Sequence, residues 1–592
     1  MKFSKLLKLL TLSSVTALAL AMAGTASAFT VDWNVDKDNP DGTDTGTVTI
    51  WHGGASASTS SMQTAVIGAF CDIAQPIDVL EDARTLGKPE FWSVACIGKG
   101  TLVASLAGKK ILWNKRDEGG SGVGVGPLAT NPPTAVGFMK PSTGVGNNCP
   151  TGAAAVRGGV AVTLWNCPNF AVPVDAYNEA SASTDGVLRV PEIGTSDIEP
   201  DKFQSIFPQN VPVADLNLDG NQNNDPLTAY KTPGVLSDVG LAQLIFNTPV
   251  NVLMYQDLQR AQFPAGHPLN ADCHPAGATY GSIANSADNA NSEKCMPSLM
   301  GNEARSIMMA GGAIRSTTDF QAENPFGSAT FAELTGTGTT DNSIHICRRV
   351  PGSGTPAQAN AIILGYPCDP TGDGTIDTLV PESEGAFTPF VVNNSSSTDV
   401  EKCLNDLNNG SNTTGKNNVP AGCVAPNCRK RWAIGVQSLE KNAPSGGAYS
   451  NAYRFIKIDS FAPTLVNAHA GDYYDVARQS IQTRIGTATV NVDARDALVP
   501  FVDNKVNLDA LNKTHAFGRS GWLGSPRSTQ VPDSALSLTQ PVAWFQRVSG
   551  AKSNTCALPS AFKKTGSPGT DITVGPQNCS NNGGADNNCY TP

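Results

Sequence analysis

Strand-like runs alternate with helix-like segments through most of this chain, without any repeat of solenoid period. The first example is Thr47–Trp51, a β-rich run that ends in the turn His52-Gly53-Gly54. Apolar residues at helical spacing follow between Ala55 and Ile73. The alternation predicts an α/β fold. A helix that begins directly after such a turn directs free N–H groups over it, which favours an anion there.

The first 28 residues have the three parts of a secretory signal peptide. A segment with three lysines is followed by the apolar run Leu9–Met22 and by Ala26-Ser27-Ala28, a signal-peptidase pattern. We therefore expect residues 1–28 to be removed and the mature protein to be periplasmic or secreted. The apolar run is shorter than the roughly 20 residues that span a bilayer, and no later segment is long and apolar enough. The mature chain is therefore expected not to be membrane-embedded.

The cysteines indicate an oxidising compartment. The chain has 592 residues and 14 cysteines, an even number. In an exported protein such a count is typical of disulfides, and sequence neighbours suggest pairs, although spacing alone leaves the connectivity open. The neighbouring cysteines are Cys71 and Cys96, Cys149 and Cys167, Cys273 and Cys295, and Cys347 and Cys368. No CxxC or CxxCH spacing occurs, which gives haem and structural zinc little support.

Length and charge limit the architecture and the partners. The residues that remain after signal-peptide removal exceed what one core usually organises, so two or more domains are expected. The formal charge is −10, and loss of the three signal-peptide lysines takes it to about −13. An acidic protein binds nucleic acid poorly, so we expect no nucleic-acid partner. If the protein binds an anion, a closed pocket of directed donors is favoured over a basic surface.

Four turns of glycine and small polar residues stand out. In chain order they are Gly54–Ser58, Gly120–Gly124, Gly194–Asp197 and Arg349–Thr355. Each offers hydroxyl groups and unhindered backbone N–H groups, and the last adds a guanidinium. A tetrahedral oxyanion requires this mixture of short donors and a delocalised cation. Any one of these turns alone would indicate only a bend in the chain.

Together and in this order, the turns resemble the motifs of the PstS-like phosphate-binding proteins. These are the substrate-binding components of phosphate ABC transporters and a branch of the type II periplasmic binding proteins. The family's GAT, GSSGG, GASD and RxDGSGT motifs have as counterparts Gly54-Ala55-Ser56, Gly120-Ser121-Gly122, Gly194–Asp197 and Arg349–Thr355. Segments Ser343–Ile346, Ala433–Val436 and Tyr453–Leu465 resemble further parts of the family.

The resemblance implies an α/β, two-lobed type II periplasmic binding protein fold, with long insertions in this chain. Lobe one would combine residues 29–250 with 450–592, and lobe two would be residues 251–449, joined by a hinge that the chain crosses twice. The stretch 566–592 is rich in Gly and Asn and contains Cys579 and Cys589, and we expect it to be a tail held by a disulfide.

The resemblance also implies a ligand site between the lobes. Its ligand-binding residues would be Ser56, Ala57, Ser121, Asp197, Arg349, Ser353, Gly354 and Thr355. Arg349 would supply the charged fork, while the serines and the helix N-terminus after Ser353 would donate hydrogen bonds. Asp197 would accept a hydrogen bond from a protonated phosphate and reject fully ionised sulfate. No catalytic residue and no required cofactor are implied.

Two function hypotheses follow. In the first, the chain is an exported solute-binding protein that binds phosphate or a similar oxyanion for uptake through an ABC permease. Two departures from the family pattern bear on the ligand: Pro351 replaces an acid that pairs with the arginine, and the interval from Ser121 to Asp197 is much longer. In the alternative, an extracellular or surface structural protein reuses the fold without transport. The insertions, the cysteines and the Gly- and Asn-rich tail favour that alternative.

Two segments resemble the first half of a calcium loop, with oxygen ligands at alternate positions and glycine at the sixth. Their candidate calcium ligands are Asp215, Asn217 and Asp219 in one segment, and Asp369, Asp373 and Asp377 in the other. Neither has the closing glutamate, so plain Asx turns are the competing interpretation.

Enzyme motifs are absent from the sequence. No GxSxG elbow, HExxH or HxH pair occurs, and the six histidines are scattered. His52 lies beside the first turn, where a structural role is favoured over a chemical one. We therefore expect a binding protein and not an enzyme.

Overall fold

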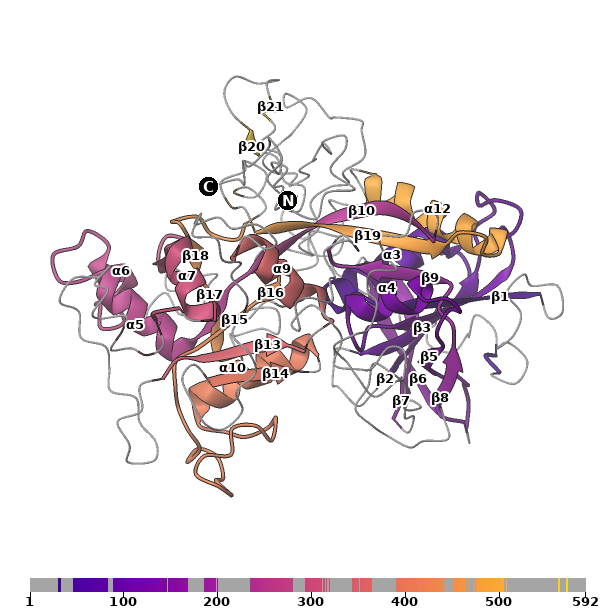
Figure 1. The fold of residues 1–592 in the computed structure, drawn as a ribbon. Helices are drawn as coiled ribbons and strands as arrows, with labels where there is room; N and C mark the ends of the chain where they lie inside the picture. The colour runs from indigo at the N-terminus through magenta and orange to yellow at the C-terminus, as the bar shows by residue number, and fades with distance from the viewer. Residues whose placement is uncertain are drawn as a thin grey trace, which may run out of the picture.

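The structure is a computed structural model, and the parts of the chain that it describes form two lobes (Figure 1). It describes residues 30–32, 46–82, 89–145, 147–168, 186–198, 235–280, 293–310, 343–350, 352–364, 390–394, 396–439, 451–464 and 475–504, with short pieces between and after them. The predicted signal peptide, the candidate calcium ligands, Pro351 and all but two residues of the predicted tail lie outside the described residues.

The first lobe is built on a ten-stranded sheet in which β1 occupies a central position. The sheet order is β16-β10-β19-β9-β1-β4-β3-β2-β7-β6. The strands are β1 (Thr47–Gly53), β2 (Asp78–Asp82), β3 (Phe91–Ile97), β4 (Lys110–Arg116), β6 (Thr151–Arg157), β7 (Val160–Cys167), β9 (Ile193–Ser196), β10 (Leu236–Asn247), β16 (Gln437–Ser438) and β19 (Val476–Arg484). β1 runs parallel to β4 and β9, whereas β19 is antiparallel to β9 and β10.

The second lobe contains a five-stranded sheet in the order β14-β13-β15-β11-β17. The strands are β11 (Pro249–Asn251), β13 (His345–Arg349), β14 (Phe390–Asn394), β15 (Ala433–Gly435) and β17 (Tyr453–Phe455). β13 is parallel to β14 and β15, and β11 is antiparallel to β15 and β17. Its order therefore repeats the segment β4-β1-β9-β19-β10 of the first lobe.

The antiparallel strand in each repeated segment comes from the chain just after it has crossed between the lobes. β10 of the first lobe leads directly into β11 of the second, and the chain returns from β17 and β18 (Lys457–Ile458) to β19. Figure 1 shows β10 and β19 running side by side along the molecule. This double crossing and shared strand order define the type II periplasmic binding protein fold, so the predicted fold class is confirmed.

Short strand pairs flank the two main sheets. They are β5 (Val136–Met139) with β8 (Gly186–Arg189), β12 (Ser298–Leu299) with β18, and β20 (Lys563–Lys564) with β21 (Asp571–Ile572). The helices are η1 (Ser56–Ser58), α3 (Thr59–Phe70), α4 (Ser121–Ala129), α5 (Val252–Gln262), α6 (Asn270–Cys273), α7 (Gly301–Met308), α9 (Gly354–Ile362), α10 (Ser397–Asn409) and α12 (Thr489–Asp503). The helix expected after the first turn is thus divided into a 3₁₀ turn and α3.

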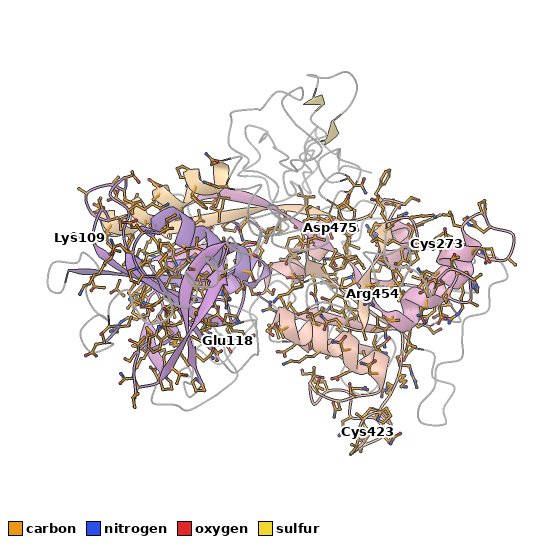
Figure 2. The ribbon with its side chains drawn as sticks, turned by 180° about the vertical axis from the view of Figure 1, so that it is seen from behind. Lys109, Glu118, Cys273, Cys423, Arg454 and Asp475 are labelled. Carbon is orange, nitrogen blue, oxygen red and sulfur yellow. A yellow bond between two sulfur atoms is a disulfide. The ribbon has the colours of Figure 1, made fainter. Side chains whose placement is uncertain are left out.

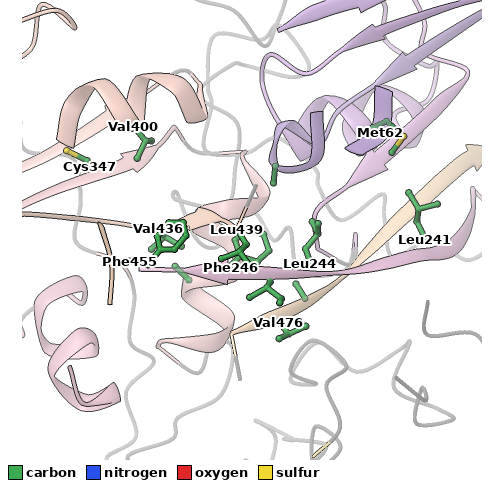
Figure 3. Close-up of a cluster of buried hydrophobic side chains, with 14 of the residues drawn as sticks. Met62, Leu241, Leu244, Phe246, Cys347, Val400, Val436, Leu439, Phe455 and Val476 are labelled. Carbon is green, nitrogen blue, oxygen red and sulfur yellow. The ribbon is translucent and has the colours of Figure 1, made fainter. Parts of the chain in front are cut away.

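One hydrophobic cluster extends from the first lobe through the crossing segments into the second. Met62 of α3 lies in the first lobe, Leu244 and Val476 lie on the crossing strands, and Val400 of α10 lies in the second lobe (Figure 3). All four side chains are buried. Because burial of apolar surface is the main stabilising contribution, the hinge is held by the same core that stabilises both lobes.

The described residues contain five disulfides. Three join sequence neighbours as expected: Cys71–Cys96, Cys149–Cys167 and Cys273–Cys295. The other two are Cys347–Cys403 and Cys423–Cys428. The suggested pairing of Cys347 with Cys368 is wrong, because α10 packs against β13 and places Cys403 with its Cα 5.9 Å from that of Cys347. Figure 2 shows Cys273 and Cys423 at the outer ends of the second lobe.

These five disulfides indicate an extracytoplasmic protein, because disulfides form and persist in oxidising compartments. Among the residues that the structure describes, no helix is both long enough and apolar enough to cross a membrane.

The disulfides of the second lobe should differ in their contribution to stability. Cys347–Cys403 spans 56 residues and Cys423–Cys428 spans only 5. From loop-closure entropy, paired substitution of Cys347 and Cys403 by Ala should lower the free energy of unfolding by about 4 kcal/mol, against about 2 kcal/mol for Cys423 and Cys428. Denaturant unfolding of both double variants measures this difference. Equal losses, or a larger loss for the shorter loop, would contradict the account.

Candidate ligand-binding site

The carboxyl ends of parallel strands from the two lobes meet at the lobe boundary. In the first lobe β1, β4 and β9 end there, and in the second lobe β13 and β14 do. The helices that follow these strands, among them α4, α9 and α10, begin at the same place (Figure 1). In open α/β sheets this edge is where ligands bind, since helix N-termini and loop residues converge there.

The first lobe contributes a hydroxyl and carboxylate pair from two different strands. Ser121 opens α4 after β4, and Asp197 follows β9; both are fully buried. The Ser121 Oγ accepts a hydrogen bond from the Asp197 backbone N–H at 2.9 Å and lies 3.2 Å from Asp197 Oδ2, to which it donates. This reciprocal bonding fixes the Asp197 side chain at the lobe boundary.

The first turn presents Ser56 and Ala57 to the same boundary. Ala55 adopts a left-handed conformation, with φ of 62°, which turns the chain sharply between β1 and η1. Ser56 and Ala57 are buried, and the Ala57 carbonyl accepts a hydrogen bond from Ser438 Oγ at 2.6 Å. That bond joins the turn to β16, which lies in the sequence between β15 and β17 of the second lobe's sheet.

Arg349, the last residue of β13, is the central cation of the second lobe and is 1% exposed. Its Nε donates to the Asn394 carbonyl at 3.3 Å, and its Nη1 donates to Ser397 Oγ at 3.1 Å. The same Nη1 reaches across the boundary and donates to Ser56 Oγ. The guanidinium therefore connects the ends of two second-lobe strands with the first turn, Gly54–Ser58.

The second lobe also presents a helix N-terminus. Ser353 is the N-cap of α9, and its side chain accepts a hydrogen bond from the Thr355 backbone N–H at 3.4 Å. A Cβ at Gly354 would lie 2.5 Å from Ser121 Oγ and 2.8 Å from the Asp197 Cβ, so only glycine fits. The Gly122 N–H donates to the Gly352 carbonyl at 2.7 Å, also across the boundary. The two lobes are thus in direct contact here.

All eight ligand-binding residues expected from the sequence gather at this boundary and are buried. They are Ser56, Ala57, Ser121, Asp197, Arg349, Ser353, Gly354 and Thr355. Their contact with a ligand stays a prediction. Among the described residues, no cluster of three or more His, Cys, Asp or Glu has the arrangement of a metal site.

Burial sets the electrostatics of the site. It raises the pKa of Asp197 to about 6, although the Ser121 hydrogen bond and the nearby Arg349 and Lys115 charges act in the opposite direction. Burial likewise lowers the pKa of Arg349, while the charges of Glu90 and Asp197 raise it.

Glu90 is a site residue that the sequence analysis missed. Although it is partly exposed, desolvation raises the pKa of its carboxyl to about 7, with Glu118 adding to the shift and Arg349 opposing it. Glu90 is the acid whose charge acts most strongly on Arg349, ahead of Asp197 and Asp399. The acid that pairs with this arginine in the family's motif is replaced by Pro351 in this sequence. The replacement of the motif's acid by Pro351 is the one sequence signal for Glu90, because a buried arginine needs a carboxylate nearby.

Lys115 and His52 form a buried layer beneath the first turn. Lys115 Nζ contacts Asp117 Oδ1 at 2.5 Å and also bonds the Gly54 carbonyl, which holds the turn in place. His52 accepts at Nδ1 from Trp113 Nε1 at 3.2 Å, and its Nε2 contacts Thr195 Oγ1. Burial and the Lys115 charge lower the pKa of His52, so it is neutral and structural.

Gln479 is a second residue that the sequence analysis missed. It lies on β19 and is 0% exposed. Its Nε2 donates to Ser58 Oγ at 2.7 Å and lies 3.5 Å from Asp197 Oδ1. No local pattern marks it, because only the return of the chain to the first lobe brings residue 479 beside residues 58 and 197.

Comparison with known proteins gives similarity at the level of fold. No family model and no curated protein matches the chain. Several solved structures are similar to it. PstS from Borrelia burgdorferi has 10% sequence identity and a TM-score of 0.23, over 56% of this chain and 79% of that chain. An ABC-type phosphate transport receptor from Vibrio cholerae has 13% identity and a TM-score of 0.23, over 48% and 72%.

The third similar structure is from Clostridium perfringens and is described as a phosphate ABC transporter substrate-binding protein with bound phosphate. It has 12% identity and a TM-score of 0.27, over 56% of this chain and 79% of that chain. Because these scores are low, the fold assignment rests on strand order and the double crossing. The chain has the two-lobed fold of solute-binding proteins.

Asp197 should make the stability of the ligand-free protein depend on pH. Its folded-state pKa is raised to about 6 from 3.8, so the stability associated with its protonation is present below 3.8 and is lost as pH rises through about 6. Asp197→Asn should therefore stabilise the ligand-free protein by up to about 3 kcal/mol above pH 7, and the gain should shrink toward low pH.

Denaturant unfolding of the wild type and the variant across this pH range measures the effect. Asp496→Asn serves as the control, because that side chain is 54% exposed and its ion pair with Arg495 should contribute little in contact with solvent. An increase in the free energy of unfolding that is equal at all pH values, or a decrease at neutral pH, would contradict the raised pKa of the buried Asp197 carboxyl.

Proposed function

We propose that this chain is an exported solute-binding protein that captures phosphate or a similar oxyanion between its two lobes and delivers it to an ABC permease. The observation that carries the proposal is the convergence of Arg349 with Ser56, Ser121 and Asp197 from the opposite lobe at a buried boundary. Groups so placed would contact a small ligand from both sides at once.

The donors fit a tetrahedral oxyanion. Arg349 offers a planar fork, which suits phosphate oxygens, and its charge-assisted hydrogen bonds are stronger than neutral ones. The N-terminus of α9, a helix of nine residues that begins at Gly354, adds backbone N–H groups and the positive end of a helix dipole. Hydroxyl groups of Ser56 and Ser121 supply neutral donors without adding countercharge.

Asp197 favours a ligand that carries a proton. A carboxylate beside an anion is repulsive unless the ligand donates a hydrogen bond to it. Phosphate retains a proton near neutral pH, whereas sulfate has none. The acidic surroundings of Arg349, which include Glu90 and Asp399, act in the same direction because they oppose a fully ionised ligand. We therefore propose phosphate-like selectivity with sulfate excluded.

Binding would exchange contacts between the lobes for contacts with the ligand. In this structure Arg349 bonds Ser56 across the boundary, and Ser121 bonds Asp197 within the first lobe, so these polar groups satisfy one another. A ligand between the lobes would take over these hydrogen bonds, and rotation about the crossing strands β10 and β19 would admit it. The proposal requires no cofactor. Calcium binding by the Asp215 and Asp369 segments stays a separate prediction.

Calorimetric titration of the mature protein tests the proposal with a matched pair of variants. Phosphate should bind and sulfate should not. Arg349→Lys keeps the positive charge but removes the planar guanidinium with its paired N–H donors, so the phosphate Kd should rise about tenfold to hundredfold. The adjacent Arg348→Lys is the control, because the Arg348 Nε donates to Asn393 Oδ1 at 2.9 Å and not across the boundary.

Equal effects of the two substitutions would place the ligand away from Arg349 and contradict the proposed site. Absence of heat with phosphate in the wild-type protein would contradict phosphate binding itself, and would favour the structural protein that reuses this fold.

A further inference from the structure

Gln479 occupies a position from which it can contact a ligand, yet it belongs to none of the four turns. Its amide nitrogen donates to Ser58 Oγ at 2.7 Å and lies 3.5 Å from Asp197 Oδ1. Ser58 closes the 3₁₀ turn that contains Ser56 and Ala57. The carboxamide of Gln479 therefore lies between the turn Gly54–Ser58 and the Asp197 carboxylate, which is proposed to accept a hydrogen bond from the ligand.

The amide oxygen of Gln479 has no hydrogen-bond partner among the residues that the structure describes, although it is buried. A buried acceptor without a donor destabilises the ligand-free protein. Both atoms of a carboxamide are attached to one carbon, so this oxygen lies next to the nitrogen that contacts Ser58 and Asp197. A ligand that brings a donor hydrogen would remove the penalty.

The orientation of the amide follows from its neighbours. Asp197 is acceptor-only when ionised, so a Gln479 oxygen facing it would be repelled, whereas the nitrogen donates. The nitrogen is thus directed to Asp197 and Ser58, and the oxygen is left as the free acceptor. The other described carboxamide on this strand, Gln482, has both atoms bonded, to the Gly124 carbonyl and to Ser480 Oγ.

We propose that Gln479 is a ligand-contacting, specificity-determining residue whose amide oxygen, together with Asp197, makes the site select an oxyanion that carries two protons. This inference rests on the proposed function and names its ligand more closely. Two acceptors that face one small anion each need a donor hydrogen from it. Dihydrogen phosphate supplies both, a singly protonated phosphate monoester supplies one, and sulfate supplies none.

The proposal gives phosphate binding a distinctive pH dependence. Phosphate loses its second proton near neutral pH. Above that point a site that requires two protons should bind with a Kd that rises about tenfold per pH unit, because one proton must be taken up with each phosphate. A site with Asp197 as its only acceptor would accept the singly protonated dianion, and its Kd would level off.

The test is calorimetric titration of inorganic phosphate into the mature wild-type protein and Gln479→Met at several pH values on both sides of neutrality. Below neutral pH the variant should bind about tenfold more weakly, because one hydrogen bond is lost. In alkaline solution the wild-type Kd should rise past that of the variant, because only the variant accepts the singly protonated dianion. Titrations in buffers of different ionisation enthalpy should show uptake of about one proton by the wild type and almost none by the variant.

Gln63→Met is the matched control. Gln63 is also a buried carboxamide of the first lobe, but it bonds Glu81 at 3.0 Å and Arg157 at 3.1 Å, away from the turns of the site. This variant should keep the wild-type pH profile even if its stability falls. A wild-type Kd that levels off in alkaline solution, or a Gln479→Met profile equal to that of wild type, overturns the inference while leaving phosphate binding intact. Absence of phosphate binding at every pH overturns the proposed function and the inference with it.

Discussion

The exchange of one antiparallel strand between the two sheets is the constraint on which the rest of the structure depends. β11 pairs with β15 and β17 in the second lobe directly after the chain leaves the first, and β19 pairs with β9 and β10 after it returns. Each sheet thus contains an antiparallel strand that begins soon after the chain has crossed from the other lobe. The carboxyl ends of β1, β4 and β9 therefore face those of β13 and β14, and the site forms where they meet.

That arrangement explains why the site is both polar and dry. Contact between the lobes removes Asp197 and Arg349 from water, which raises the pKa of Asp197 and lowers the pKa of Arg349. Internal hydrogen bonds compensate only in part, since the Gln479 oxygen has no partner among the described residues. An enclosed set of directed donors and acceptors is also what an acidic protein needs to bind an anion against its overall charge.

Local patterns in the sequence were enough to predict the turns but not their surroundings. Glycine and small polar residues identified the four turns, because each motif lies within a few residues. The resemblance of these motifs to a known family then selected Ser56, Ser121, Asp197 and Arg349. Gln479 and Glu90 were missed, since long-range strand pairing brings them to the site. The partner of Cys347 was missed for the same reason: helix packing on β13, and not sequence distance, selects Cys403.

The central claim is that an oxyanion binds between the carboxyl ends of strands from opposite lobes. A crystal structure of the mature protein grown with phosphate tests it most directly. The account predicts tetrahedral density within hydrogen-bond distance of Arg349, Asp197 and the N-terminus of α9, with the bond between Arg349 and Ser56 replaced by bonds to the ligand. Phosphate bound elsewhere, with that bond unchanged, would contradict it.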